Sequence, residues 1–150
     1  MALGIENIPI EMLAHILDNV GVGIVIDNAA GEVIWGNEAH ARITGVDVRK
    51  YIGRSVWEVR NDPDIEYISL TGSLFEAAVR AGKSVHNVLK YKTADRIINT
   101  TTPIYSEDGV LEYVVCTLIN FSQANEVQQV LASAFAKIDA LEGRLAEMQS

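Results

Sequence analysis

The chain has 150 residues, of which 49% are hydrophobic and 21% are charged. This length suits about one domain that buries its own core, and the composition excludes a disordered chain. The net charge of −8, from 12 basic and 20 acidic residues, argues against nucleic-acid binding by this segment.

Cys116 is the only cysteine, which excludes an internal disulfide and a cysteine-rich metal site. The N-terminus shows no signal peptide, and no apolar run approaches the roughly 20 residues of a membrane span. We therefore expect a cytoplasmic protein without membrane contact. His15, His40 and His86 lack metal-ligand spacing, so we expect no metal and assign the three histidines solvated or capping roles.

Residues 1–9 form a lead into an expected helix, since apolar residues from Ile10 onward recur at helical spacing. Two short strands at residues 22–26 and 32–36 then predict a hairpin. Gly31 lies in its turn, where the backbone needs a positive φ.

Short helices are expected after the hairpin. Asn37 can cap a helix over residues 38–43 and hold the strand-to-helix corner by bonding to backbone groups. A further helical turn at residues 47–51 is closed by Gly53. Residues 73–81 have the spacing of a longer helix.

Three longer strands are predicted at residues 84–92, 96–105 and 110–121. The connections between them are short enough to join only antiparallel neighbours, so the strands form a meander. Gly109 lies in the second of these turns, where φ is again expected to be positive.

Residues 123–150 carry an apolar seam with heptad spacing and are mostly polar elsewhere, which predicts a coiled coil. The seam consists of Val127, Leu131, Ala134, Ile138, Leu141, Leu145 and Met148. An amphipathic helix that folds back on its own sheet is the alternative. Because the pattern runs to the last residue, we expect an effector to follow this linker.

The order of these elements over residues 10–122 resembles the PAS domain, a small sensor module. The residues that carry the resemblance are Ile16-Leu17-Asp18-Asn19, Gly23, Ile24, Asp27, Gly31, Val33, Ile34, Asn37, Ala39, Gly45, Tyr51-Ile52-Gly53-Arg54-Ser55, Thr102-Pro103-Ile104 and Asp108-Gly109. The resemblance implies an α+β fold: an antiparallel five-stranded sheet with short helices on one face, an N-terminal helix and a coiled-coil exit helix.

The threonine-rich residues 99–104 and the exit helix are most similar to the N-terminal sensor of bacterial activators that use sigma-N and carry an AAA+ ATPase domain. This resemblance implies a sensor and dimerisation module, not an enzyme, that passes a ligand or redox cue to a transcriptional regulator. Sensor histidine kinases and cyclic-dinucleotide enzymes carry similar modules and are alternatives. A ligand-free protein-interaction domain is a further alternative.

Side-chain alternation places several polar groups on the inner face of the sheet. The inward residues are expected to be Val85, Asn87, Leu89 and Tyr91, then Ile97, Asn99, Thr101 and Pro103 (mainly by resemblance), then Val114, Cys116 and Leu118. Buried amides need partners, which could be one another, a water or a small ligand. The candidate ligand-binding residues are Asn87, Asn99, Thr101, Cys116 and Leu118, with Arg60 and Asn61 at the rim.

The charge pattern and the cysteine and histidine positions narrow the expected ligand. Ten of the 12 basic residues lie between Arg42 and Arg96, which favours a neutral or anionic ligand over a cation. No cysteine precedes Cys116, which argues against the covalent flavin chemistry of similar modules. Haem is disfavoured because no histidine lies between Arg54 and Ser84. The cofactor, if any, stays unknown.

The last long strand is apolar on both faces, so its outer face must be covered by a terminal helix or a second subunit. We therefore expect a homodimer built through the outer sheet face and the coiled coil. The signal is expected to pass through Asn120 into the heptad seam. Similar modules usually have an acidic residue there, and asparagine can keep hydrogen bonds but not an ion pair.

Overall fold

The computed structural model describes residues 4–63, 65–67, 73–92 and 94–149. Residues 1–3 of the expected lead, Thr93 between two strands and Ser150 of the expected linker lie outside the described residues. The chain divides into two compact units, Met1–Asn120 and Phe121–Ser150.

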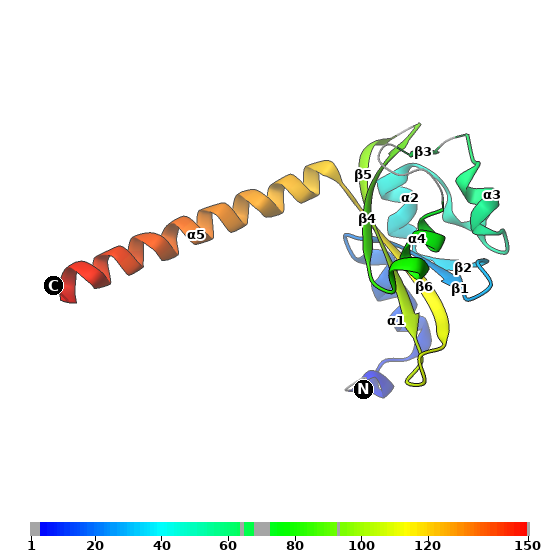
Figure 1. Ribbon diagram of the computed structural model, residues 1–150, viewed down its shortest axis with the longest axis horizontal. Helices are drawn as coiled ribbons and strands as arrows, with labels where there is room; N and C mark the ends of the chain where they lie inside the picture. Colours follow the sequence, from blue (N-terminus) through cyan, green and yellow to red (C-terminus); the bar gives the residue numbers. More distant parts are fainter. Residues whose placement is uncertain (1–3, 64, 68–72, 93, 150) are drawn as a thin grey trace. The chain divides into compact units, whose positions relative to one another are not determined.

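The first unit is built on one antiparallel sheet with the strand order β2-β1-β6-β5-β4-β3 (Figure 1). The strands are β1 (Gly23–Asn28), β2 (Val33–Gly36), β3 (Ile65–Tyr67), β4 (Val85–Tyr91), β5 (Ala94–Tyr105) and β6 (Leu111–Asn120). The predicted five-stranded antiparallel sheet is confirmed, and the three-residue β3 adds a sixth strand at the β4 edge.

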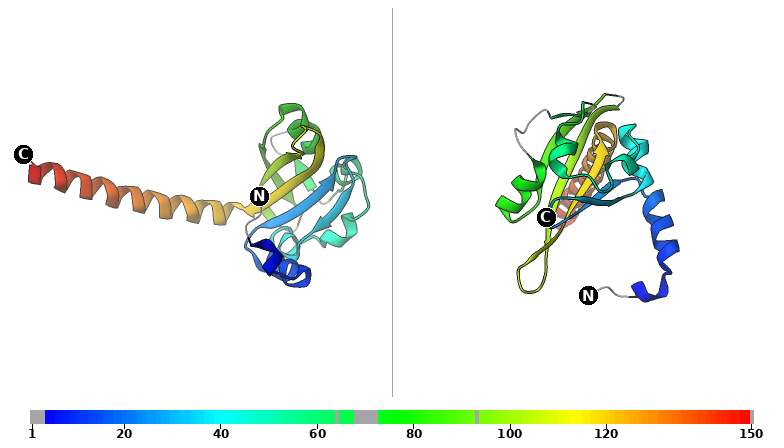
Figure 2. Two further views of the ribbon diagram at one scale, coloured as in Figure 1. Left: turned by 90° about the horizontal axis from the view of Figure 1, so that it is seen from below. Right: turned by 90° about the vertical axis from the view of Figure 1, so that its right-hand side faces the viewer.

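Strand register aligns the inward residues in rows across the sheet. One row contains Asn87, Asn99, Leu118 and Gly23, and the next contains Val85, Thr101, Cys116 and Val25. The predicted inner faces are confirmed, since Leu89, Ile97, Val114 and other inward residues are buried. The sheet twists strongly from β1 and β2 towards β4 and β5 (Figure 2).

Short helices lie on one side of this sheet (Figure 1). They are α2 (Glu38–Thr44), α3 (Val56–Arg60) and α4 (Leu74–Ala81), preceded in the chain by η1 (Ile5–Asn7) and α1 (Ile10–Asn19) and interrupted by η2 (Val48–Tyr51). Helices α2 and α4 contact the sheet, whereas α1 contacts α2. The core between these layers is formed by Val33, Val46, Tyr51, Leu74, Leu89, Tyr91, Ile97 and Leu118.

Local sequence explains where the helices begin and end. The side chains of Asn37, Ser55 and Ser73 each accept a hydrogen bond from the backbone N–H three residues later. These N-caps satisfy donors that a first helical turn leaves free. Helices α2 and α4 end at Gly45 and Gly82, whose positive φ angles close the last turn.

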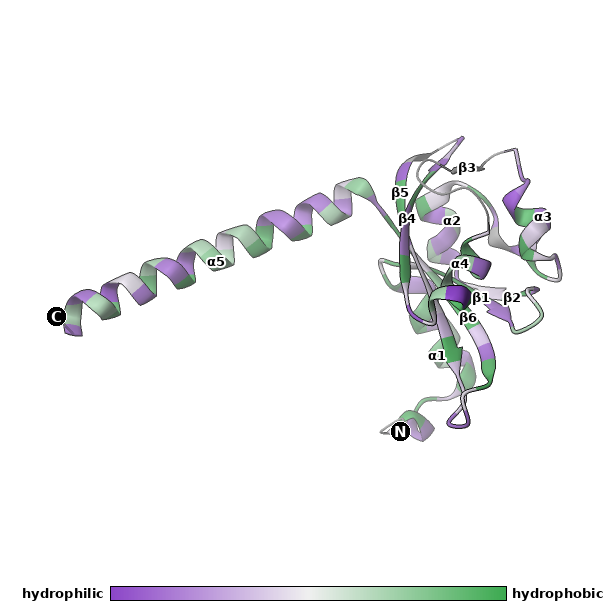
Figure 3. Ribbon diagram, in the orientation of Figure 1, coloured by the Kyte–Doolittle hydropathy of each residue, from purple (hydrophilic) through white to green (hydrophobic). Residues whose placement is uncertain are grey.

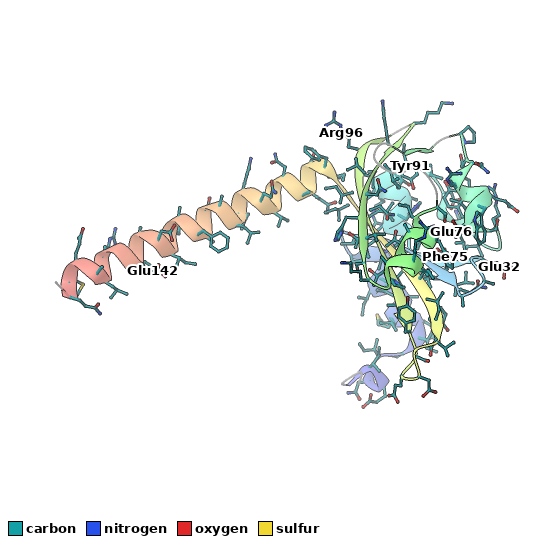
Figure 4. All side chains as sticks on the ribbon, in the orientation of Figure 1. Glu32, Phe75, Glu76, Tyr91, Arg96 and Glu142 are labelled. Carbon is teal, nitrogen blue, oxygen red and sulfur yellow. The ribbon has the colours of Figure 1, made fainter. Side chains whose placement is uncertain are left out.

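Gly31 fixes the β1–β2 turn against α3. Its φ is 83°, and a Cβ atom built on it would lie 2.7 Å from Cζ3 of Trp57. The indole of Trp57 donates a 2.8 Å hydrogen bond to Oε1 of Glu76, and its ring lies 6.1 Å from that of Phe75. Figure 4 labels Phe75 and Glu76 on α4. The hairpin turn, α3 and α4 are therefore packed together at this glycine.

We expect Gly31→Ala to lower the free energy of unfolding by about 2–4 kcal/mol, from left-handed strain plus displacement of Trp57. Gly109→Ala is the matched control, because Gly109 has a φ of 81° and no atom within 4 Å of an added Cβ. The control is expected to cost only about 1–2 kcal/mol. Urea unfolding followed by tryptophan fluorescence measures both losses, and equal losses would contradict the packing role of Gly31.

The second unit is the continuous helix α5 (Phe121–Gln149), whose 29 residues correspond to roughly 43 Å. It begins two residues before the predicted linker start at residue 123, because Phe121 is helical and not the end of a strand. No residue of α5 is buried, and Figure 3 shows hydrophobic and hydrophilic residues interleaved along it. Among the described helices, none combines the length and hydropathy that a membrane span requires.

Candidate functional site

A cavity of about 80 Å³ lies between the inner face of the sheet and the short helices. Residues of β1, β2, β4, β5 and β6 form its floor, and α2, α3, α4 and Tyr51 of η2 close it. The polar lining residues are Asp27, His40, Arg60, Ser73, Asn99 and Cys116. The other lining residues are apolar or tyrosine, so polar groups are few and closely placed, as in small-molecule sites.

Four of the seven candidate ligand-binding residues line this cavity: Asn99, Cys116, Leu118 and Arg60. The other three do not. Asn87 and Thr101 are buried on the same face of the sheet but lie outside the lining. Asn61 is exposed and ends α3 as its C-cap. The cavity also includes Val25 and Asp27 of β1, which the sequence does not assign to the site.

The buried polar groups of β5 partly satisfy one another. The Thr101 hydroxyl donates a 2.6 Å hydrogen bond to Oδ1 of Asn99, and its Oγ1 lies 3.6 Å from Sγ of Cys116. Burial, and then the charge of Asp27, raises the pKa of the Cys116 thiol to about 12. Because thiolates and not thiols are the reactive form, Cys116 is unreactive at neutral pH.

Asp27 is a cavity residue that sequence reasoning missed as a site residue. Its side chain is 4% exposed, and burial raises the pKa of its carboxyl from 3.8 to about 7. Alternation along β1 could have identified it, because Gly23, Val25 and Asp27 share the inward face and alternate with outward residues. That phase places an acid opposite Val114 in the core.

His40 is also in the cavity, so its expected solvated or capping role is wrong. Its side chain is 2% exposed and makes edge-to-face contacts with Tyr51 and Tyr91, at ring distances of 6.2 and 6.3 Å. Burial lowers the pKa of His40 to about 4, so the ring is neutral at pH 7. His15 and His86 are exposed, as predicted.

His86 lies on the outer face of the sheet, where its Nδ1 is 2.9 Å from Oγ1 of Thr100. In the part of the chain that the structure describes, no three His, Cys, Asp or Glu side chains are grouped to bind a metal ion. The cavity is also smaller than the roughly 150 Å³ that admits a benzene-sized molecule, so a haem or flavin ring would require it to widen.

The predicted structural residues lie outside the cavity. Asn37 is fully buried and bonds to backbone groups of α1, β1 and α2, which confirms its role at the corner. Gly31, Gly53 and Gly109 all have φ between 81° and 84°, the conformation that favours glycine.

The outer face of the sheet exposes apolar side chains. Ile104 and Tyr113, which are cross-strand partners, are 40% and 43% exposed. Val115, Thr117 and Ile119 on the same face of β6 are partly buried. Helix α1 adds further exposed apolar residues, among them Ile10 and Met12. Exposed apolar side chains of this kind are typical of an interaction face.

Residues 21–123, more than two thirds of the chain, match a family model described as a PAS domain. The chain therefore belongs to the PAS domain family, as the resemblance in its sequence implies. No curated protein matches the sequence at a significant level.

Solved structures with low sequence identity share the fold. An RNA-binding light-oxygen-voltage receptor aligns over 93% of this chain and 41% of its own, with 15% identity and a TM-score of 0.61. The chain thus spans about two fifths of that receptor. A PAS domain from Colwellia psychrerythraea aligns over 75% of this chain and 97% of its own, with 16% identity and a TM-score of 0.52. The PAS domain of nitrogen regulation protein NR(II) from Vibrio parahaemolyticus aligns over 73% and 98%, with 11% identity and a TM-score of 0.51.

Proposed function

We propose that this PAS domain is the sensor and dimerisation module of a bacterial signal-transduction protein. The observation that carries the proposal is the path of β6. Cys116 and Leu118 of β6 line the cavity, the strand ends at Asn120, and α5 begins at the next residue. A ligand that displaces β6 would therefore act directly on the helix, with no loop to absorb the movement.

The cue is proposed to be a ligand rather than a redox change. The high pKa of Cys116 keeps its thiol protonated, which weakens the case for oxidation of this residue. The cavity offers a buried carboxyl and an amide to a small molecule. Ligand binding would shift β6 and the packing of α5 between two states.

The dimer is proposed to form through the outer sheet face and the α5 seam. Val127, Leu131, Ile138, Leu141 and Leu145 of the seam are 47% to 58% exposed. Two copies of such a seam can cover each other in a coiled coil. A coiled coil also gives the signal a mechanism, because its register and packing are sensitive to small shifts at one end.

Ala134→Asp is expected to weaken the dimer about 100-fold or more, because it places a charge inside the seam. Ala136→Asp is the matched control: it has the same helix propensity cost, but it lies two residues further on, away from the seam. Native mass spectrometry of the freshly purified chain measures the dimer fraction and any bound small molecule. Equal dissociation in both variants would exclude the proposed seam.

The output is proposed to be transcriptional regulation, on the strength of residues 99–104 and their similarity to sensors of sigma-N-dependent activators. A sensor histidine kinase or a cyclic-dinucleotide enzyme is the alternative context. The domain itself is proposed to have no enzyme activity and to act in the cytoplasm.

A ligand-free interaction domain is a second candidate, favoured by the small cavity and by the hydrogen bond between Thr101 and Asn99. In that case the cavity polar groups serve the core alone. Dimers that carry no bound mass and whose spectra do not respond to any small molecule would favour this candidate.

A further inference from the structure

Asp27 is an ionisable group in the cavity whose carboxyl has no hydrogen bond or ion pair with any described residue. The side chain is 4% exposed, so water reaches it poorly. A buried carboxylate without a partner is costly, and burial accordingly raises the pKa of this carboxyl to about 7. Among the described residues, the cavity thus contains an acid with no hydrogen-bond or ion-pair partner.

The other titratable groups with resolved pKa values around the cavity supply no buried positive charge. His40 from α2 is neutral at pH 7, because burial lowers its pKa to about 4. The Cys116 thiol from β6 is protonated, because burial raises its pKa to about 12. Arg60 from α3 lines the cavity but is exposed, so solvent screens its charge.

Three aromatic rings line the same cavity: Tyr51, Phe75 and Tyr91. Figure 4 labels Phe75 on α4 and Tyr91 on β4. The face of an aromatic ring attracts a cation by about 0.5–2 kcal/mol, most strongly where water is excluded. A buried carboxyl together with aromatic rings is the combination that recognises an ammonium group.

We infer that the cavity, which Asp27 lines together with Tyr51, Phe75 and Tyr91, binds a small organic ammonium ion whose nitrogen pairs with Asp27. The inference rests on the proposed sensor function and names the ligand class of that same site. The volume of about 80 Å³ admits a ligand of only a few heavy atoms.

This ligand class differs from the neutral or anionic ligand that the basic block of residues 42–96 favours. Of the ten basic residues in that block, Arg60 alone is among the residues described as lining the cavity. Asp27 and Arg60 thus both line the cavity, but only Asp27 is buried.

Binding is expected to release a proton near neutral pH. The ammonium ion favours the ionised form of Asp27, so the pKa of this carboxyl falls when the ligand is bound. The proton leaves the carboxyl for solvent, and no covalent bond of the ligand changes.

Three probes of similar size test the inference: n-propylammonium chloride, 1-propanol and sodium propionate. Each is titrated into the whole chain while NMR records the backbone amides and the Asp27 carboxyl carbon. We expect n-propylammonium to bind about tenfold more tightly than 1-propanol, and propionate to bind most weakly. We also expect the ammonium probe, and not the others, to lower the pKa of Asp27.

Asp27→Asn is expected to lose the tenfold preference for n-propylammonium while its affinity for 1-propanol stays about the same. The pKa readout on the unmodified chain tests the inference even if this variant does not fold. Tightest binding of propionate, an unchanged pKa of Asp27, or no binding of any probe would overturn the ammonium assignment. Binding of 1-propanol or propionate alone would still leave the proposed sensor function standing.

Discussion

Asn37→Ala is expected to lower the free energy of unfolding by about 3–5 kcal/mol, a large share of the roughly 5–15 kcal/mol of a typical domain. The Asn37 Nδ2 donates to the carbonyl oxygens of Leu17, at 2.7 Å, and Val22, at 2.9 Å. Its Oδ1 accepts from the N–H groups of Ile24, at 2.8 Å, and His40, at 3.2 Å. Alanine would leave these backbone groups without the amide that joins α1, β1 and α2.

Asn28→Ala is the matched control for this loss. The Asn28 side chain also accepts two backbone hydrogen bonds, from Ala30 and Glu32, but these bonds are exposed. Water can replace them, so the control is expected to cost about 1 kcal/mol. Urea unfolding followed by circular dichroism measures both variants. Similar losses of unfolding free energy at positions 28 and 37 would contradict the role of burial.

If Asn37→Ala does not fold, Asn37→Ser replaces it in the comparison. This variant keeps an N-cap oxygen and is expected to lose less unfolding free energy than Asn37→Ala.

The second large effect concerns pH, because Asp27 and His40 should give opposite slopes of stability against pH. The pKa of Asp27 rises from 3.8 to about 7 on folding. The folded state therefore binds more protons than the unfolded state between these values, and stability falls as pH rises from 3.8 to 7. At about 1.4 kcal/mol per pKa unit, the fall amounts to about 4 kcal/mol.

The pKa of His40 moves the other way, from 6.5 to about 4. Here the unfolded state binds more protons, so stability is complete above pH 6.5 and is lost as pH falls towards 4. The loss amounts to about 3 kcal/mol. The two slopes therefore nearly cancel between pH 4 and 6.5 in the unmodified chain.

Single substitutions separate the two slopes. Asp27→Asn is expected to gain stability by about 3 kcal/mol as pH rises from 4 to 6.5, because only the His40 contribution remains. His40→Gln is expected to lose about 4 kcal/mol as pH rises from 4 to 7. Urea unfolding at closely spaced pH values measures each profile. Parallel profiles in the two variants would show that neither group titrates as its burial requires.

Much of the fold could be predicted from the sequence because its signals are local. Alternation in residues 84–92 distinguishes one face of the sheet from the other, and turns with Gly31 and Gly109 define the strand ends. The caps at Asn37 and Gly45 likewise mark α2. Each of these signals depends on neighbouring residues alone.

The features that were not predicted are short or depend on distant contacts. Helix α3 has five residues and β3 has three, which is too few for a periodicity to show. Trp57 is placed by Gly31 and Glu76, which are far from it in the sequence.

The candidate site was predicted in part for a similar reason. The resemblance and strand alternation together place Asn99 of β5 and Cys116 of β6 correctly, and alternation applied to β1 includes Asp27. To place His40 in the cavity, one must know which side of α2 faces the sheet. Ala39, His40 and Thr44 are the buried residues of this helix. The basic residues between Arg42 and Arg96 favoured a neutral or anionic ligand. Net charge along a sequence does not say which of these side chains point into the cavity.

The position of β6 in the sheet has a consequence for how the chain is made. β6 pairs with β1 on one side and β5 on the other, although it is the last strand to be synthesised. After the β1–β2 hairpin has been synthesised, residues 37–120 must follow before β6 is complete. These 84 residues take about 4–17 s of translation at typical rates. Meanwhile Ile24, Val25 and Ile26 present an open strand edge, which can pair with other chains. The nascent domain should therefore depend on a chaperone most strongly just before β6 emerges from the ribosome.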